Sequence, residues 1–385
     1  ADADIYKQYL AALTNPKAIN QSELLIAVGK ILEEFLALFF DIKSGNSDLQ
    51  NQHSQLANLY IAKRLFVQRR VAKKYSSFLD VATQFENSEL ELANQIALYL
   101  QDENQYFQEL EALEKYCAWA LYHQDGITKH KNGVLFKLPK KIDFENLVEL
   151  ETTEDGIKKS PDHHLKNRDG FKLTDQGCNL AAALSEANYC IFCHNQGKDS
   201  CRSGLKKKEN SFKKDPFKTE LSGCPLDEKI SEMNLLKSEG KSIAALAMAI
   251  VDNPMIAGTG HRICNDCMKS CIYQVKGAGQ EPVNIPQVET RTLKDVLNLP
   301  FGFEIYSLLT RWNPLNLERV LEKAPSGYKV LVAGLGPAGY TLAHHLLNEG
   351  HLVVGVDGLK IEPLDPEISG IDLAGNRHQF KPIKD

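Results

Sequence analysis

The sequence predicts a mainly α-helical protein that finishes in the opening strand, helix and strand of a parallel α/β unit. Three observations support this fold class. Apolar residues recur at helical spacing over the first 125 residues, cysteines gather in the middle of the chain, and a glycine-rich turn follows an apolar run near the end. With 385 residues, of which 43% are hydrophobic and 25% charged, the chain has the composition of a globular protein of two or three domains.

Charge and apolar patterning disfavour two classes of protein. A formal net charge of −5 does not suit general binding to nucleic acid, whose phosphates need a basic surface. The most apolar run, residues 24–40, is interrupted by a lysine and two glutamates, which is typical of an amphipathic helix packed on a core and not of a membrane span. We expect no secretory signal, and hence a cytoplasmic protein with reduced thiols and no membrane partner.

Residues 1–165 are predicted to form a helical domain that ends in an irregular linker. Asn20, with a glutamate three residues on, resembles a capping box, and the helix that follows is expected to stop near Gly45. Two further long helices are predicted over residues 56–75 and 88–123. We expect a bundle that packs on its neighbours, and a docking module for a partner subunit is the alternative.

Glycine and proline break residues 126–175 into short pieces, which indicates a linker wrapped over a domain surface. One strand is predicted at residues 133–138. His163 and His164 invite a metal hypothesis. Adjacent histidines in a loop point apart in most geometries, so we expect a solvated surface pair instead.

The cysteines carry the strongest chemical signal. Seven of the nine lie between residues 190 and 271, a density that packing does not require, because valine or alanine fills the same space without reactivity. Their tight spacings, two C-x2-C and one C-x3-C, allow thiolates to converge on one centre. Cys117 is expected to be a buried thiol, and Cys178 a core thiol or an eighth ligand. The seven are Cys190, Cys193, Cys201, Cys224, Cys264, Cys267 and Cys271.

Three chemistries compete for these thiols. Disulfides are disfavoured in a reducing compartment. Zinc ribbons separate their C-x2-C pairs by about 15–20 residues, whereas Cys193 and Cys264 lie far apart with two predicted helices between them. Iron–sulfur clusters are favoured, because Cys224 followed by proline resembles the end of a bacterial cluster-binding run. Seven cysteines are one short of two four-cysteine clusters, and a non-cysteine ligand could fill the gap.

The chain between the cysteines contains a basic segment and then two helices. Residues 202–218 hold seven basic and two acidic side chains, which is either a solvated insertion or a positive face that docks an acidic electron carrier. Two helices joined at Gly240 are predicted over residues 225–254, and this pair returns the chain to the cysteine region.

The last unit begins with a buried strand after Tyr328. Three glycines follow in the order G-x-G-x-x-G, then a helix, a second strand and an acid 23 residues after the first glycine. This context predicts the opening of a Rossmann-type dinucleotide-binding domain, in which backbone and helix N-terminus face a pyrophosphate and the acid accepts from a ribose hydroxyl. Because only 28 residues follow the acid, we expect the rest of the polypeptide or a partner subunit to complete the domain. The residues are Gly334, Gly336, Pro337, Ala338, Gly339 and Asp357.

Over residues 175–360 the chain resembles a family of iron–sulfur flavoproteins. The motifs CIFC, GCPL, DNP, GHRICNDCMKSC and GLGPAG are similar to those of the glutamate synthase small (beta) subunit and of the N-terminal part of dihydropyrimidine dehydrogenase. The resemblance implies an α-helical, ferredoxin-like domain over residues 166–295, a linker over 296–326 and a partial FAD-binding domain over 327–385.

The resemblance also implies the cofactors. Two [4Fe-4S] clusters would relay electrons between FAD, reduced by NAD(P)H bound in the parent protein, and an acceptor. By itself this fragment would be inactive. A non-catalytic module stabilised by zinc or by clusters is the alternative. The implied ligands are Cys190, Cys193, Cys201 and Cys271 for one cluster and Cys224, Cys264, Cys267 and Glu289 for the other.

Overall fold

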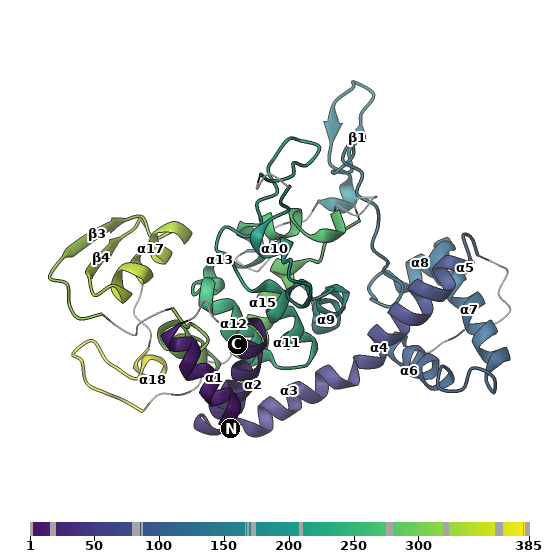
Figure 1. Cartoon of the computed structure of the whole chain (residues 1–385). Coiled ribbons are helices and arrows are strands. Elements are labelled where there is room, and N and C mark those ends of the chain that lie inside the picture. Colours follow the sequence, from purple (N-terminus) through teal and green to yellow (C-terminus); the bar gives the residue numbers. More distant parts are fainter. Residues whose placement is uncertain are drawn as a thin grey trace.

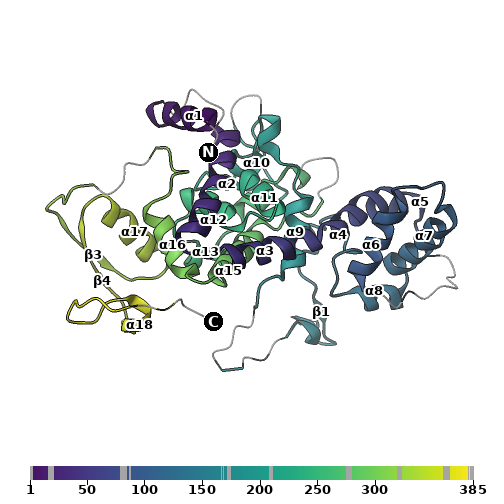
Figure 2. The same ribbon diagram turned by 90° about the horizontal axis from the view of Figure 1, so that it is seen from below.

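The structure, a computed structural model, shows a mainly helical protein (Figure 1). The described residues contain two small sheets, each of two strands. Central helices lie between an outer helical unit on one side and a β-α-β unit on the other, as Figures 1 and 2 both show. The described residues are 3–15, 21–78, 85, 88–165, 167, 169–170, 175–207, 211–274, 280–318, 323–358, 365–379 and 381.

The N-terminal helices are α1 (Ala3–Thr14), α2 (Gln21–Phe39) and α3 (Lys43–Gln55). The predicted stop at Gly45 is wrong, because this glycine lies inside α3. The chain turns earlier, at Asp41, whose φ of 54° is left-handed and ends α2. Asn20, the expected cap, lies outside the described residues.

The outer helical unit follows directly. The predicted helix over residues 56–75 consists of α4 (Ala57–Ile61), a π-helix η2 (Ala62–Val71) and α5 (Ala72–Lys74). A ten-residue π-helix is unusual, since most are single turns. Further along are α6 (Glu89–Tyr99), α7 (Phe107–Tyr122) and α8 (Gln124–His130).

The single helix predicted over residues 88–123 is wrong, because the chain breaks between α6 and α7. Ser88 does start α6 through a capping box with Glu91. After α6 the Asp102 carboxylate accepts a hydrogen bond from the Gln105 backbone N–H at 3.1 Å. Short acidic side chains compete for backbone groups in this way and favour turns over helix interiors.

The strand predicted at residues 133–138 is also wrong. The backbone N–H groups of Val134 and Leu135 donate to the Glu89 carboxylate, at 2.7 and 2.9 Å, and not to a neighbouring strand. The same carboxylate lies 3.1 Å from His130 Nδ1. The linker does hold one hairpin, in which β1 (Glu151–Thr152) pairs antiparallel with β2 (Lys158–Lys159), followed by a 3₁₀ turn η3 (Asp162–His164).

The central region confirms the predicted helix pair, since α11 (Ile230–Ser238) and α12 (Ser242–Asp252) join at Gly240, whose φ is +77°. Around them the chain forms short turns that carry the cysteines and longer helices that form the core. The elements are α9 (Leu180–Tyr189), η4 (Cys193–Gln196), α10 (Ser200–Ser203), α11 (Ile230–Ser238), α12 (Ser242–Asp252), α13 (Ile256–Ile263), α14 (Asp266–Lys269), η5 (Ile272–Gln274), α15 (Ile285–Leu297) and α16 (Gly302–Arg311).

Two hydrophobic cores hold these helices. The larger contains Leu36 of α2 and Leu246 of α12, both wholly buried. The smaller contains Phe66 of η2 and Leu110 of α7, and it is joined by Leu184 of α9. The cores therefore cut across the expected division at residues 165 and 166: α2 packs with the cysteine-bearing helices, and α9 contributes Ala187 to the larger core and Leu184 to the smaller one.

Two buried polar groups fix the central helices. The Glu33 carboxylate of α2 accepts hydrogen bonds from the backbone N–H groups of Ile243 and Ala244, at 3.0 and 3.1 Å, and so caps α12. Lys237 of α11, wholly buried, is paired with the buried Asp295 of α15. This second contact ties α11 to α15, the helix that carries Glu289.

The β-α-β unit consists of β3 (Lys329–Ala333), α17 (Pro337–Asn348) and β4 (Leu352–Val356), with a short α18 (Pro366–Ser369) after it. β3 and β4 are parallel, with Lys329 opposite Leu352. Leu331 is 66% exposed, whereas parallel strands are usually buried on both faces. No helix in the described part of the chain combines the length and the apolar character that crossing a membrane requires.

Candidate metal centre

The first group of cysteines comes from four short elements. Cys190 ends α9, and Cys193 opens η4 after Phe192, whose φ of 52° turns the chain sharply back. Cys201 lies in α10, and Cys271 follows α14. All nine cysteines of the chain are free thiols in the structure.

Electrostatic contacts show that these four side chains are neighbours. A hydrogen bond from Cys201 lowers the pKa of the Cys271 thiol to about 7, and the same contact raises the pKa of Cys201. Burial raises the pKa of Cys193 to about 12, and the charges of Cys190 and Cys271 add to this shift. Burial also raises the pKa of Cys190 to about 11, with Cys271 again contributing.

The second group consists of Cys224, Cys264, Cys267 and Glu289. Burial raises the pKa of Cys267, and the nearby charges of Glu289, Cys224 and Cys264 raise it further. Burial first, then the charge of Glu228 and, to a smaller extent, that of Glu289 raise the pKa of Cys224 to about 12. Cys264 is the one exposed thiol of the group, so the group meets solvent there.

A second carboxylate, Glu228, belongs to this group and was not anticipated from the sequence. It is 5% exposed and hydrogen-bonded to Glu289, which is 6% exposed. Burial and the Glu228 charge raise the pKa of Glu289 well above its usual range. Two carboxyls that share a proton avoid like-charge repulsion. The only sequence signal for Glu228 is its place four residues after Cys224.

The two groups are separate but linked through the backbone. The Cys224 N–H donates to the Cys201 carbonyl oxygen at 2.8 Å. Cys267 lies in α14, and Cys271 follows the end of the same short helix. The eight side chains that the sequence pointed to therefore lie as two neighbouring sets of four.

A buried polar side chain without a partner near the first cysteine group indicates what kind of ligand the group could bind. The Ser200 hydroxyl, next to Cys201, is buried and makes no hydrogen bond to the described residues. Asn234 stands next to Cys190, where it counters the burial that raises the pKa of that thiol. Buried donors without partners are costly, so they suit a bound group that accepts hydrogen bonds, such as inorganic sulfide.

The spacing of the thiols bears on the kind of metal. A single zinc ion binds sulfur at about 2.3 Å, so its ligand atoms must lie within about 4 Å of one another. Within the described residues, three ligand atoms gather within 4.8 Å of one another at Glu149, His163 and His164, and not among the cysteines. In a four-iron cluster each thiolate binds its own iron, so four sulfurs need not converge on a single ion.

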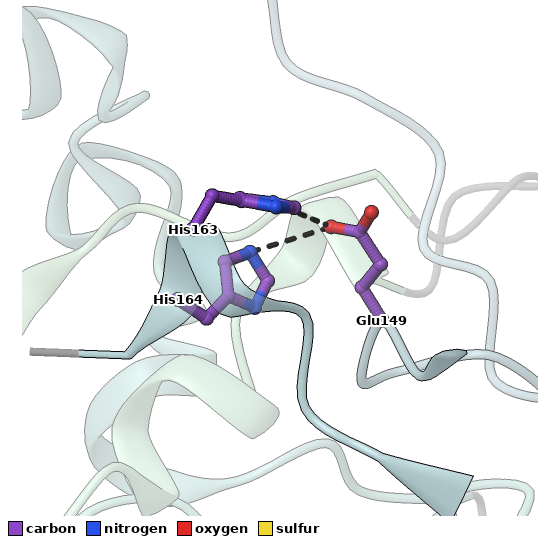
Figure 3. A group of neighbouring side chains, drawn as sticks. All are labelled: Glu149, His163 and His164. Carbon is purple, nitrogen blue, oxygen red and sulfur yellow. Dashed lines mark ion pairs between the residues drawn. The ribbon is translucent and has the colours of Figure 1, made fainter. Parts of the chain in front are cut away.

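The histidine pair differs from its expectation, as Figure 3 shows. The idea that His163 and His164 point apart is wrong, because their Nε2 atoms lie 3.4 and 3.3 Å from the same carboxylate oxygen of Glu149. The 3₁₀ turn η3 brings the ring centroids within 4.3 Å. All three side chains are exposed, as expected, and they offer one carboxylate and two imidazoles, a donor set that zinc accepts.

The two remaining cysteines stand outside both groups. Cys178 donates from its backbone N–H to Gln287 Oε1 at 3.0 Å, and burial raises its pKa without a contribution from another cysteine. Cys117 is wholly buried in the smaller core.

The basic segment is partly paired. Arg202 contacts Asp227 at 2.7 Å, and Lys214 contacts Glu220 at 3.7 Å. Lys206 and Lys207 are exposed, and residues 208–210 lie outside the described residues.

The glycine-rich turn has the backbone that a phosphate requires. Gly334 has a φ of +91°, and a Cβ at Gly336 would meet no atom within 4 Å, so its backbone is open to a ligand. A Cβ at Gly339 would lie 1.8 Å from the Gly334 carbonyl oxygen, so only glycine fits. Pro337 and Ala338 start α17 beside a cavity of about 490 Å³, and Asp357 Oδ2 accepts from the Leu335 N–H at 2.5 Å.

The fold and site define a mainly helical protein with two thiol-rich groups and a glycine-rich β-α-β turn. No protein-family model matches the chain. The chain is 59% identical over 110 residues to Uncharacterized protein RP006 of Rickettsia prowazekii (strain Madrid E), a match that covers 29% of this chain and 15% of that protein. The chain therefore spans less than a sixth of the length of this relative.

A second relative defines the family. The chain is 30% identical over 269 residues to Uncharacterized protein RP005 of the same organism, which covers 62% of this chain and 89% of the relative. The chain belongs to the family of RP005.

Proposed function

We propose that this chain is the electron-relay part of an iron–sulfur flavoprotein oxidoreductase, of the kind that the glutamate synthase small subunit and the N-terminal part of dihydropyrimidine dehydrogenase represent. The observation that supports this most is the separation of eight potential ligands into two sets of four. One [4Fe-4S] cluster would be held by Cys190, Cys193, Cys201 and Cys271, and the other by Cys224, Cys264, Cys267 and Glu289. Bound together, the clusters and a flavin would supply electron transfer between NAD(P)H and an acceptor.

The protein's residues would hold and tune these groups. Cys193, Cys201, Cys267 and Cys271 are each less than 9% exposed, so their sulfurs are shielded from water. The Asn234 amide can donate toward the Cys190 sulfur, and such hydrogen bonds raise cluster reduction potentials. Glu228, by sharing a proton with Glu289, can hold that carboxyl in place until a metal displaces the proton.

The glycine-rich turn would bind the adenosine diphosphate part of FAD. Gly336 leaves room for the pyrophosphate, the N-terminus of α17 faces it, and Asp357 can accept from the ribose. The exposed apolar strands β3 and β4 support completion of this domain by the rest of the polypeptide or by a partner subunit. An acidic electron carrier would dock at the exposed lysines of residues 202–218.

Metal analysis after anaerobic purification tests the proposal. We expect about eight irons and eight sulfides per chain and a brown protein whose broad absorption near 400 nm bleaches on reduction. Zinc as the sole metal in a colourless protein would instead favour the non-catalytic, metal-stabilised module.

A further inference from the structure

A cavity of about 480 Å³ lies between the outer helical unit and the first cysteine group. One wall is formed by η2, with Lys63, Arg64 and Arg69. The opposite wall includes Cys190 and the stacked Tyr273. Figure 2 shows α4, which leads into η2, beside α9. A hydrogen bond of 2.8 Å from Lys63 Nζ to Ser185 Oγ joins the two sides.

The π-helix explains why two arginines face this cavity together. Residues five apart point about 140° apart in an α-helix, so Arg64 and Arg69 would lie on different faces there. In a π-helix the hydrogen bond itself links residues five apart, and such residues lie on nearly the same face. η2 is a π-helix throughout residues 62–71, and both arginines line the cavity.

Positive charge exceeds negative charge in the walls. Lys137 joins the three cations of η2, and the lining carboxylates are Glu186 and Glu281. Both carboxylates are already engaged by backbone N–H groups: Glu186 accepts from Asn284 at 2.8 Å, and Glu281 accepts from Lys140 at 3.1 Å.

Three of the four cations lack a partner of their own. Within the described part of the chain, the side chains of Arg64, Arg69 and Lys137 make no hydrogen bond or ion pair with a protein group, and all three residues are exposed. Lys63 is more confined, and burial lowers its pKa to about 8. A ligand with two negative charges would compensate these cations without opening any existing contact.

The size and the remaining lining define the ligand further. A volume of about 480 Å³ is within the range of small-molecule sites and much larger than a bare phosphate needs. Tyr189 and Tyr273 stack with ring centroids 4.1 Å apart and an interplanar angle of 6°, and both line the cavity. Aromatic walls of this kind pack against the apolar or planar body of an organic molecule.

We propose that this cavity binds a small organic dianion, of the phosphate monoester or dicarboxylate class, through Arg64 and Arg69 of the π-helix. The inference stands on the cavity alone and does not require that iron is bound. Arginine binds either oxyanion in a bidentate manner, so the geometry defines the shared chemistry and the experiment separates the two sources.

Calorimetric titration of the whole purified chain tests this site, with phenyl phosphate and glutarate as the two dianionic probes and phenol as the uncharged one. We expect saturable binding of at least one dianion, weakened by salt, and none of phenol. Arg64→Gln and Arg69→Gln should each weaken it about ten-fold, the cost of one charge-assisted hydrogen bond. Arg311→Gln, an exposed arginine on α16, is the matched control and should bind as the unaltered chain does.

A second possible phosphate site must be distinguished from this cavity, because the glycine-rich turn can also bind a phosphate. Gly336→Val blocks that turn and should leave binding at the cavity unchanged. Absence of binding, or binding that is lost with Gly336→Val and unaffected by Arg64→Gln and Arg69→Gln, would overturn the proposal. Iron content, measured on the same samples, reports separately on the relay.

Discussion

Replacing Lys237 with methionine tests the packing that holds the cysteine-bearing helices together. Lys237 is wholly buried on α11, and its ammonium group is paired with Asp295 of α15, which is 2% exposed. Methionine fills a similar volume without charge, so the change leaves the Asp295 carboxylate buried without its main partner. Arg291 still contacts Asp295 at 2.6 Å and compensates in part.

The expected cost follows from this geometry. Removing one partner of a buried ion pair costs about 3–5 kcal/mol of stability. Because the Arg291 contact remains, we expect Lys237→Met to lower the free energy of unfolding by about 3 kcal/mol. The matched control is Lys30→Met, because Lys30 and Glu239 form a 2.7 Å pair that is 40% and 39% exposed. Pairs of this kind contribute about 0–1 kcal/mol.

Urea unfolding followed by circular dichroism measures both variants. We expect a clearly lower midpoint for Lys237→Met and almost none of this shift for Lys30→Met, with similar slopes. Equal midpoints for the two variants would refute the view that this buried pair fixes α15, and with α15 the position of Glu289.

Three further predictions concern single side chains. His53 is 5% exposed, and burial first, then the Lys237 charge, lower its pKa to about 4. As pH falls from about 6.5 to about 4, only the unfolded state gains the proton, so the protein should lose about 3 kcal/mol of its free energy of unfolding over that window. His53→Gln should flatten this dependence of stability on pH. Gly339→Ala should speed amide hydrogen exchange in β3 and α17, because its Cβ overlaps the Gly334 carbonyl oxygen, whereas Gly336→Ala should not; equal exchange would contradict the turn geometry. Asn234→Leu should leave the iron content unchanged and lower the potential of the first cluster by about 40 mV, the equivalent of about 1 kcal/mol for one lost hydrogen bond; an unchanged redox titration would remove Asn234 from the site.

Local signals in the sequence predicted several elements correctly. The helix pair that joins at Gly240, the helix start at Ser88 and the parallel pairing of β3 with β4 are all present. Each depends on residues close together in the chain: a glycine with positive φ, a serine with a glutamate three residues on, or glycines between two apolar runs. Such signals can be recognised in the sequence without knowledge of the tertiary contacts.

Features set by distant contacts were not predictable in the same way. The segment after His130 is apolar enough for a strand, but two of its backbone N–H groups donate to the Glu89 carboxylate and not to a neighbouring strand. In the sequence, the apolar residues of η2 show no periodicity that would distinguish a π-helix from an α-helix. Glu228 and Asn234 become notable only when the fold buries them beside the cysteines.

The division of the chain was the hardest feature to foresee. Leu36 of α2 and Leu246 of α12 lie in one core although they are about two hundred residues apart, and Leu184 of α9 lies in the other core. Amphipathic periodicity shows that a helix has an apolar face, but it does not show which other helix covers that face.

Iron content of paired cysteine variants tests the central claim most directly, namely two separate clusters in two sets of ligands. After anaerobic purification, Cys190→Ser and Cys224→Ser should each lose about four of about eight irons with the helical content unchanged, and Cys178→Ser, outside both sets, should lose none. A chain in which either ligand variant keeps all of its iron, or in which no variant holds iron at all, would contradict the account.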